Sequence, residues 1–343
     1  MFASLIEKLQ RRQDLTQEEA AGAMDAIMEG RAQPAQIAGF LIGLSMKGER
    51  PAEIVGLAQT MRARATKLSR THAPVFDTCG TGGDRAATFN VSTVAALVLA
   101  ACGVTVAKHG NRSVSSQCGS ADLFEALGVR VSAEPDAVER CLDEVGIAFF
   151  FAPTFHPSMR HAAPTRKDLG VRTAFNLLGP LTNPAGASRQ LVGVPRPELT
   201  ELVARSLALL GSERAWVVHG ADGLDEISTT GYTKVSECRD GTVNTFYVHP
   251  ADFGLAKSLS SQLRGGDAAA NAAIARRVLG GELGAARDIV LLNAAASLLI
   301  ADRVATIADG IAQAAAVLDN GKAAEALERL ITVSNRPAQA AAS

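Results

Sequence analysis

Residues 75–84 read Val-Phe-Asp-Thr-Cys-Gly-Thr-Gly-Gly-Asp, a short apolar segment that runs directly into three glycines. Val75–Thr78 predicts a strand and the glycines predict a tight turn, after which Asn90–Ala101 predicts a helix. Glycines let backbone N–H groups approach a phosphate without a Cβ in the way, and a helix N-terminus adds the positive end of its dipole. An ordinary strand-to-helix turn needs fewer glycines, so this segment predicts a phosphate-binding turn. It matches neither the dinucleotide-binding nor the P-loop pattern of glycines.

Further along the chain, short apolar segments alternate with helical patterns. Such alternation is typical of a parallel sheet that helices cover on both faces. Strands are predicted at Val104–Ala107, Val129–Val131, Ile147–Phe151, Gln190–Val194 and Ala215–His219, with an antiparallel section at Thr233–Glu237 and Val243–Val248. Helices are predicted at Ser120–Leu127 and Pro135–Val145, and from Asp267 onward. The predicted fold class is therefore α/β, with a mostly parallel central sheet covered by helices.

The first seventy residues show only helical patterns. Thr16 and Glu19 have the spacing of a capping box, and Pro34 and Pro51 stand where prolines begin helices. We therefore predict a small all-helical domain over residues 1–72 and an α/β domain over residues 73–343. Residues 155–184 are predicted to be helical and interrupt the sheet pattern, so they are expected to pack on the helical domain.

Composition excludes several classes of protein. Lys and Arg number 34 against 35 Asp and Glu, a net charge of −1, which lacks the basic footprint of a nucleic-acid-binding protein. The five cysteines include no C-x-x-C pair, so we expect neither a disulfide framework nor a zinc site but a reducing compartment, the cytoplasm. The longest apolar runs are shorter than the roughly 20 residues of a membrane span, and Met1–Arg12 lacks a signal-peptide pattern.

Two further polar segments follow predicted strands. Residues 108–116 read Lys-His-Gly-Asn-Arg-Ser-Val-Ser-Ser, and cations together with hydroxyls suit phosphate binding. Because ligands gather at the carboxyl ends of parallel strands, this segment is expected beside the glycine turn, although His109 alone suits a structural role equally well. Asp225 and Glu226 follow a later strand and could supply the carboxylates that Mg²⁺ prefers. Taken alone, such an acidic pair is more often solvated charge, and a two-carboxylate hydrolase has no other support.

These segments, in this order, resemble the anthranilate phosphoribosyltransferase family. The resemblance spans nearly the whole chain and includes Gln36–Leu41, Met46–Glu49, Arg172–Pro184 and Gly223–Ser228. It implies a small α-helical domain on an α/β domain, and a homodimer joined through the helical domains. It also implies the transfer of the phosphoribosyl group of 5-phosphoribosyl 1-pyrophosphate (PRPP) to anthranilate, a magnesium-dependent step of tryptophan biosynthesis.

The resemblance also assigns the site, residue by residue. It implies that PRPP is held by Gly80, Gly83, Asp84, Thr88, Asn90, Val91, Ser92, Thr93, Lys108, His109, Gly110, Asn111, Arg112, Ser113, Val114, Ser115, Ser116 and Ser120. Magnesium is expected at Ser92, Asp225 and Glu226, and anthranilate at Gly80, Asn111 and Arg166. An arginine can grip a carboxylate with two hydrogen bonds, but only the resemblance singles out Arg166 from Arg160 and Arg172. No catalytic acid or base is assigned.

The chain departs from the family's pattern in two places. Arg85-Ala86-Ala87 follows the glycine turn where more glycine is usual, and Gln117-Cys118 stands where a basic or small polar pair is usual. Three alternatives remain. A pyrimidine nucleoside phosphorylase shares the fold but needs a base-reading site, a nucleic-acid-binding relative predicts a basic surface, and a plain scaffold leaves the polar clusters unexplained.

Overall fold

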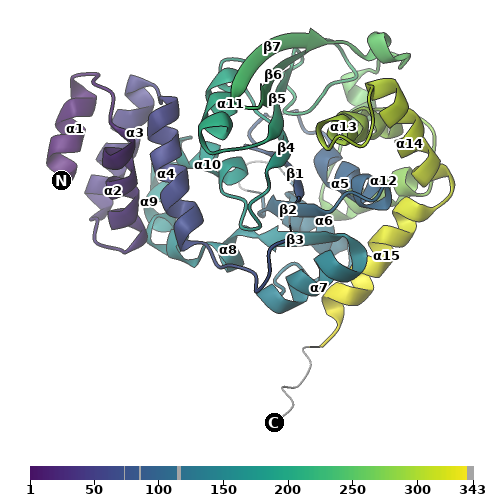
Figure 1. Cartoon of the computed structure of the whole chain (residues 1–343), viewed down its shortest axis with the longest axis horizontal. Helices are drawn as coiled ribbons and strands as arrows, with labels where there is room; N and C mark the ends of the chain where they lie inside the picture. Colours follow the sequence, from purple (N-terminus) through teal and green to yellow (C-terminus); the bar gives the residue numbers. More distant parts are fainter. Residues whose placement is uncertain (73, 85, 114–116, 338–343) are drawn as a thin grey trace.

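A computed structural model describes residues 1–72, 74–84, 86–113 and 117–337. The chain begins with a bundle of four helices, drawn in purple in Figure 1: α1 (Phe2–Gln10), α2 (Gln17–Met28), α3 (Pro34–Lys47) and α4 (Pro51–Arg64). The helix starts confirm the sequence signals. The Thr16 hydroxyl accepts a hydrogen bond from the Glu19 N–H at 3.2 Å, and Glu19 accepts one from the Thr16 N–H at 3.0 Å. Pro34 and Pro51 are the first residues of α3 and α4.

The rest of the chain is built on one seven-stranded sheet in the order β3-β2-β1-β4-β5-β6-β7. Its strands are β1 (Phe76–Gly80), β2 (Val106–Gly110), β3 (Ile147–Phe151), β4 (Arg189–Gly193), β5 (Arg214–Gly220), β6 (Thr233–Arg239) and β7 (Thr242–Val248). Strands β1–β5 are parallel to one another, and the β5–β6 and β6–β7 pairs are antiparallel. This confirms the predicted fold class, including the antiparallel section.

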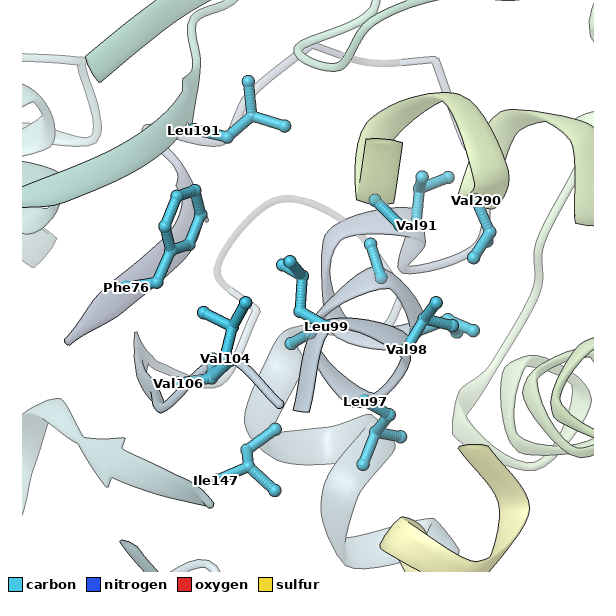
Figure 2. Close-up of a cluster of buried hydrophobic side chains, with 14 of the residues drawn as sticks. Phe76, Val91, Leu97, Val98, Leu99, Val104, Val106, Ile147, Leu191 and Val290 are labelled. Carbon is cyan, nitrogen blue, oxygen red and sulfur yellow. The ribbon is translucent and has the colours of Figure 1, made fainter. Parts of the chain in front are cut away.

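One face of the sheet packs on helices that follow β1, β2 and β7 in the chain. These are α5 (Val91–Ala101), α6 (Ser120–Leu127), α7 (Pro135–Val145), α12 (Ala268–Leu279), α13 (Ala285–Ile300), α14 (Ile307–Asp319) and α15 (Lys322–Asn335). Figure 2 shows Leu99 of α5 beside Val104 and Val106, with Val290 of α13 near Val98. Most of α5 is fully buried, because α13 and α15 cover the side that faces away from the sheet. The N-terminus of α5 is thereby fixed at the carboxyl end of β1.

The other face shares its core with the helical bundle. The connecting helices are α8 (Ala152–Phe155), α9 (Ala163–Leu169), α10 (Phe175–Leu181) and α11 (Leu199–Leu209), with 3₁₀ turns at Pro157–His161, Pro250–Phe253 and Ser260–Leu263. Alternate residues of β4 point to opposite faces: Leu191 joins the α5 core, while Val192 joins a core that includes Phe40 and Leu57 of the bundle. Helices α9 and α10 also contact α3 and α4. The bundle and the sheet therefore bury one continuous apolar surface.

One predicted strand is wrong. Val129–Val131 forms no strand, although Val129 and Val131 are buried. Gly128 ends α6 in the left-handed conformation, the Val129 N–H donates to the Phe124 carbonyl at 2.9 Å, and the Arg130 N–H donates to the Ser334 hydroxyl at 3.2 Å. The segment packs against α15 and has no neighbouring strand. Its apolar residues therefore reflect burial in the core and not hydrogen bonding within a sheet. Of the described helices, none is long and apolar enough to cross a membrane.

A buried ion pair organises the turn between α3 and α4. The Glu53 carboxylate is completely buried and accepts hydrogen bonds from the Leu15 N–H at 2.8 Å and the Arg50 N–H at 2.7 Å. It also lies 3.1 Å from the Lys47 ammonium, whose side chain is 2% exposed. One carboxylate therefore ties α4 to both the start of α2 and the end of α3.

We expect Glu53→Ala to lower the free energy of unfolding by about 2–4 kcal/mol, because it leaves the buried Leu15 N–H and the part-buried Arg50 N–H without their acceptor. It also removes one partner of Lys47, whose ammonium keeps the Asp14 carboxylate at 2.8 Å. Urea unfolding followed by circular dichroism measures the change. Glu18→Ala is the matched control, since Glu18 is exposed on the neighbouring helix, and its effect should stay within about 0.5 kcal/mol. A loss below about 1 kcal/mol for Glu53→Ala would show that the carboxylate does not hold the turn.

Candidate active site

A cavity of about 760 Å³ lies at the carboxyl ends of β1 and β2 and the N-terminus of α5. Its wall includes nearly all of the predicted site residues: Gly80, Gly83, Asp84, Thr88, Asn90, Val91, Ser92, Thr93, Lys108, His109, Gly110, Asn111, Arg112, Ser113, Ser120, Asp225 and Glu226. Val114, Ser115, Ser116 and Arg85 lie outside the described residues. Three segments that are distant in the sequence thus meet at one edge of the sheet, as ligand sites in parallel sheets do.

The glycine turn is held by an arginine. Gly82 and Gly83 have φ of 64° and 85°, a backbone region that favours glycine. The Arg172 guanidinium donates to the Gly82 carbonyl at 2.6 Å and to the Thr81 carbonyl at 3.1 Å. A Cβ on Gly83 would overlap that guanidinium. The turn therefore needs glycine for both its conformation and its contact with Arg172.

Two other glycines bring the acidic pair to the turn. A Cβ on Gly80 would lie 2.6 Å from the Asp225 Oδ2 atom, and a Cβ on Gly193 would overlap the Asp225 carbonyl oxygen. The strands β1 and β4 place these glycines side by side, because Gly80 is paired with Gly193 in the ladder. Asp225 therefore lies directly on the ends of two strands, and Glu226 accepts a hydrogen bond from the Ser92 N–H at the start of α5, at 3.0 Å.

Burial makes both acids unusually weak. The pKa of Asp225 lies well above its ordinary value because the carboxyl is desolvated and because the Asp84 and Glu226 carboxylates lie nearby. Burial also raises the pKa of Glu226 to about 7, although Lys108 and the Ser92 N–H oppose the shift. Asp225 and Glu226, with Asp84 beside them, repel one another when ionised, a repulsion that a cation with further ligands of its own would relieve.

Lys108 lies inside a strand rather than in the loop that the sequence predicted. Its side chain is 1% exposed and donates to the Thr78 carbonyl, and the Ser92 hydroxyl lies 3.4 Å from the ammonium. Burial lowers its pKa, against the attraction of Asp77 and Glu226. Strand β2 continues to Gly110 because residues 106–110 pair with β3. The lysine side chain is thus held in one position at the cavity wall.

The His109 ring is held away from the other cavity groups. Its Nδ1 atom lies 3.1 Å from the Gly179 carbonyl, which can only accept, so Nδ1 carries the proton. The ring packs against His156 with a centroid distance of 5.2 Å. Burial, then the neighbouring His156, lowers the pKa of His109 to about 3. The imidazole is therefore neutral, and its geometry favours the structural alternative that the sequence left open.

A carboxylate of α6 closes the loop that follows β2. Asp122 accepts hydrogen bonds from the Ser113 N–H at 3.0 Å and the Gly119 N–H at 2.8 Å, which stand on either side of the loop. The Arg112 guanidinium donates to Asp122 at 3.0 Å and to Glu125 at 2.7 Å. The loop is thus anchored at its base, with Arg112 engaged by acids of its own chain.

The structure separates one predicted ligand from the rest. Arg166 is not part of the cavity wall; it lies on α9, half-buried, with its guanidinium 4.9 Å from the centre of the Phe175 ring. Its role towards anthranilate stays a prediction. Arg172 and Asn176 occupy the cavity wall in this region instead. Composition and spacing alone did not distinguish these arginines, because only the fold shows that the connection between α9 and α10, which carries Arg172, lies against the glycine turn.

The sequence did not point to three residues that shape the cavity, of which only Arg264 is part of its wall. Gly193 receives the Asp225 backbone, Asp122 closes the loop after β2, and Arg264 belongs to a segment that runs alongside Thr88. A glycine at the end of an apolar strand was a usable signal for Gly193. Asp122 stands at the third position of α6, where an acid commonly accepts from the N-cap N–H, so it too had a local signal. Arg264 acts through a contact between distant segments, which no local pattern records.

The metal-binding potential of the cavity is partial. No group of three or more His, Cys, Asp or Glu side chains within residues 1–72, 74–84, 86–113 and 117–337 has an arrangement that could hold a metal ion. Mg²⁺, however, takes one or two carboxylates and completes its shell with water and substrate phosphate oxygens. The donor set of Asp225, Glu226 and the Ser92 hydroxyl fits an ion that arrives with a phosphate ligand.

Comparisons with known proteins agree with this arrangement. A helical bundle domain of a glycosyl transferase family matches residues 3–65, and the a/b domain of a glycosyl transferase family matches residues 72–324. The anthranilate phosphoribosyltransferase of Moorella thermoacetica is 58% identical over 295 residues, which cover 86% of this chain and 87% of that protein.

Two solved structures show the same fold over nearly the whole chain. The anthranilate phosphoribosyltransferase of Thermus thermophilus has a TM-score of 0.91 and 45% identity, covering 97% of this chain and 99% of that chain. The enzyme from Saccharomyces cerevisiae in complex with PRPP and Mg has a TM-score of 0.88 and 28% identity, covering 97% of each chain.

Proposed function

The chain belongs to the anthranilate phosphoribosyltransferase family, and on that premise we propose how its residues carry out the family's reaction. The reaction transfers the phosphoribosyl group of PRPP to the amine of anthranilate and gives N-(5-phosphoribosyl)anthranilate and pyrophosphate, in L-tryptophan biosynthesis. The observation that carries the proposal is the convergence of the glycine turn, the Lys108 strand and the acidic pair on one cavity. The domain division at residue 72, a homodimer through the helical bundle and a location in the cytoplasm are proposed with it.

The proposed site residues fall into three groups, which bind PRPP, Mg²⁺ and anthranilate. In the proposal, the glycine turn, the first turn of α5 and residues 108–120 hold the phosphates and the ribose. Asp225, Glu226 and Ser92 hold Mg²⁺, which would neutralise charge on the departing pyrophosphate. Gly80, Asn111 and Arg166 are proposed to hold anthranilate. The buried charge of Lys108 is fixed before substrate binds, so it stabilises developing negative charge without reorganisation.

The chemical step needs little from acid–base groups. The bond between the ribose C1 carbon and the pyrophosphate oxygen breaks, the bond from C1 to the anthranilate nitrogen forms, and the nitrogen then loses a proton to water. An aromatic amine is already nucleophilic near neutral pH, so no strong base is required. Catalysis on this proposal rests on positioning and on stabilisation of the leaving group.

Mass spectrometry of the products distinguishes this reaction from its nearest alternative. The purified protein, given PRPP, anthranilate and Mg²⁺, is expected to form N-(5-phosphoribosyl)anthranilate and pyrophosphate in equal amounts. Formation of ribose 1-phosphate from a pyrimidine nucleoside and phosphate, with no anthranilate product, would instead identify a nucleoside phosphorylase.

The raised pKa of Glu226 predicts how Mg²⁺ binding depends on pH. In the metal-free protein the pKa is about 7, against an ordinary value of 4.5. The raised pKa means that protonated Glu226 stabilises the folded protein. This stabilisation is fully present below pH 4.5 and is lost as the pH rises through about 7. Because Mg²⁺ needs the ionised carboxylate, its affinity should be roughly tenfold higher at about pH 8 than at about pH 6.

Thermal unfolding with Mg²⁺ alone measures this effect. The rise in Tm on adding Mg²⁺ should grow between these two pH values, and Glu226→Gln should reduce the pH dependence to the part that Asp225 contributes. An equal rise at both pH values in the unsubstituted protein would contradict the assignment of Glu226.

A further inference from the structure

Arg264 lies on the cavity wall. It forms an isolated antiparallel bridge with Thr88, which lies between the glycine turn and α5. The Phe89 N–H donates to the Leu263 carbonyl at 3.2 Å, and the Gly265 N–H donates to the Ala87 carbonyl at 2.9 Å. These two hydrogen bonds flank the pair formed by Thr88 and Arg264. That pair is therefore of the non-hydrogen-bonded kind, in which the side chains stand on the same side with Cβ atoms about 4.5–5.5 Å apart.

The segment is rigidly placed. Leu263 is 1% exposed within the core, and a Cβ on Gly265 would lie 2.7 Å from the Phe89 Cα atom. Asn271 at the start of α12 accepts a hydrogen bond from the Gly266 N–H at 2.8 Å and donates to the Asn90 side chain at 3.0 Å. The backbone on both sides of Arg264 is thus fixed against the N-terminus of α5.

Arg264 is also the one positively charged side chain of the described cavity wall without a protein partner. Lys108 donates to the Thr78 carbonyl, Arg172 to the carbonyls of the glycine turn, and Arg112 to two acids of α6. Arg264 is exposed, and its guanidinium has no hydrogen bond or ion pair with any described residue. A charged fork held beside a threonine hydroxyl on a cavity wall is the arrangement that binds a phosphate.

We propose that Arg264 binds a phosphate group of PRPP together with the Thr88 hydroxyl. This inference rests on the proposed function, since it assumes that PRPP occupies the cavity. It assigns a substrate-binding role to the segment before α12. This segment is separate from the glycine turn and from the residues after β2. The close packing of Gly265 on Phe89 supports this role, because it fixes the backbone of Arg264 opposite Thr88.

Calorimetric binding of PRPP with Mg²⁺, in the absence of anthranilate, tests the inference. Arg264→Gln is expected to weaken binding roughly 10- to 100-fold, as for the loss of a charge-assisted hydrogen bond. Arg264→Lys should recover part of the affinity, because it keeps the charge and loses the fork. Arg239→Gln is the matched control: Arg239 is exposed and pairs with the first residue of β5, at the opposite edge of the sheet from the cavity. Unchanged PRPP affinity in Arg264→Gln would overturn the inference.

Turnover distinguishes this failure from a failure of the proposed function. In Arg264→Gln the KM for PRPP should rise and the KM for anthranilate should stay within about twofold. Competition by pyrophosphate and by ribose 5-phosphate then identifies which phosphate group of PRPP contacts Arg264. Only the competitor that carries this phosphate should inhibit Arg264→Gln more weakly than it inhibits the unsubstituted protein. If neither competitor weakens, the inference is wrong. If the unsubstituted protein binds PRPP through Arg264 but transfers nothing to anthranilate, the inference stands and the proposed function falls.

Discussion

Replacing Asp225 by asparagine and Glu226 by glutamine together is expected to lower kcat roughly 1,000-fold. The reason is the loss of both carboxylates proposed to hold Mg²⁺ against the departing pyrophosphate. The substituted protein should remain folded. Both pKa values are raised in the metal-free protein, which means that the neutral forms are favoured there, and glutamine can still accept the Ser92 N–H.

The measurement is the rate of anthranilate consumption over a Mg²⁺ titration, with Tm recorded beside it. A double variant of exposed acids, Asp240→Asn with Glu282→Gln, removes the same charge elsewhere on the surface and should keep its rate within about twofold. Retention of both turnover and Mg²⁺ dependence in the Asp225 and Glu226 variant would show that the acidic pair does not hold the metal.

Gly193→Ala is expected to lower kcat/KM for PRPP about 100-fold, although it replaces no side chain proposed to bind PRPP or Mg²⁺. A Cβ at this position would overlap the Asp225 carbonyl oxygen, and backbone atoms cannot move aside as a flexible side chain does. The loop that carries Asp225 and Glu226 must therefore shift away from the end of β4. A displacement on the order of 1 Å of catalytic groups costs about 100-fold in rate.

Gly231→Ala is the matched control for Gly193→Ala. Gly231 lies in the connection between β5 and β6 that also carries Asp225 and Glu226, and a Cβ there would meet nothing within 4 Å. Steady-state kinetics of both variants, with Tm to confirm folding, separates the effect of the contact from that of adding a methyl group. Equal kinetics for the two variants would mean that the Asp225 loop does not depend on Gly193.

The parts of the fold that follow from local chemistry were predictable. The Thr16 capping box, the prolines that begin α3 and α4, and the glycine turn before α5 depend on residues close together in the sequence. The ends of the strands were not predictable in the same way. Strands β1 and β2 extend to Gly80 and Gly110 because neighbouring strands continue to pair there, and Val129–Val131 lacks such a neighbour.

The candidate site shows the same division. The three polar segments were recognisable because each follows a strand and combines glycine, cations or acids. The position of Arg166 relative to Arg172, and the contact of Thr88 with Arg264, depend on how distant helices and loops pack. At Ala87 the backbone has a left-handed φ of 53°, a conformation that favours glycine. Glycine is the residue type more usual after this turn in the family that the sequence resembles.

Anthranilate fluorescence, followed with purified protein, PRPP and Mg²⁺, with and without a chelator, tests the central claim most directly. Rapid loss of fluorescence that the chelator abolishes is the predicted result, because transfer to the amine consumes anthranilate and the leaving group needs Mg²⁺. Unchanged fluorescence in the complete mixture, from protein shown to be folded by its thermal unfolding, would contradict the account.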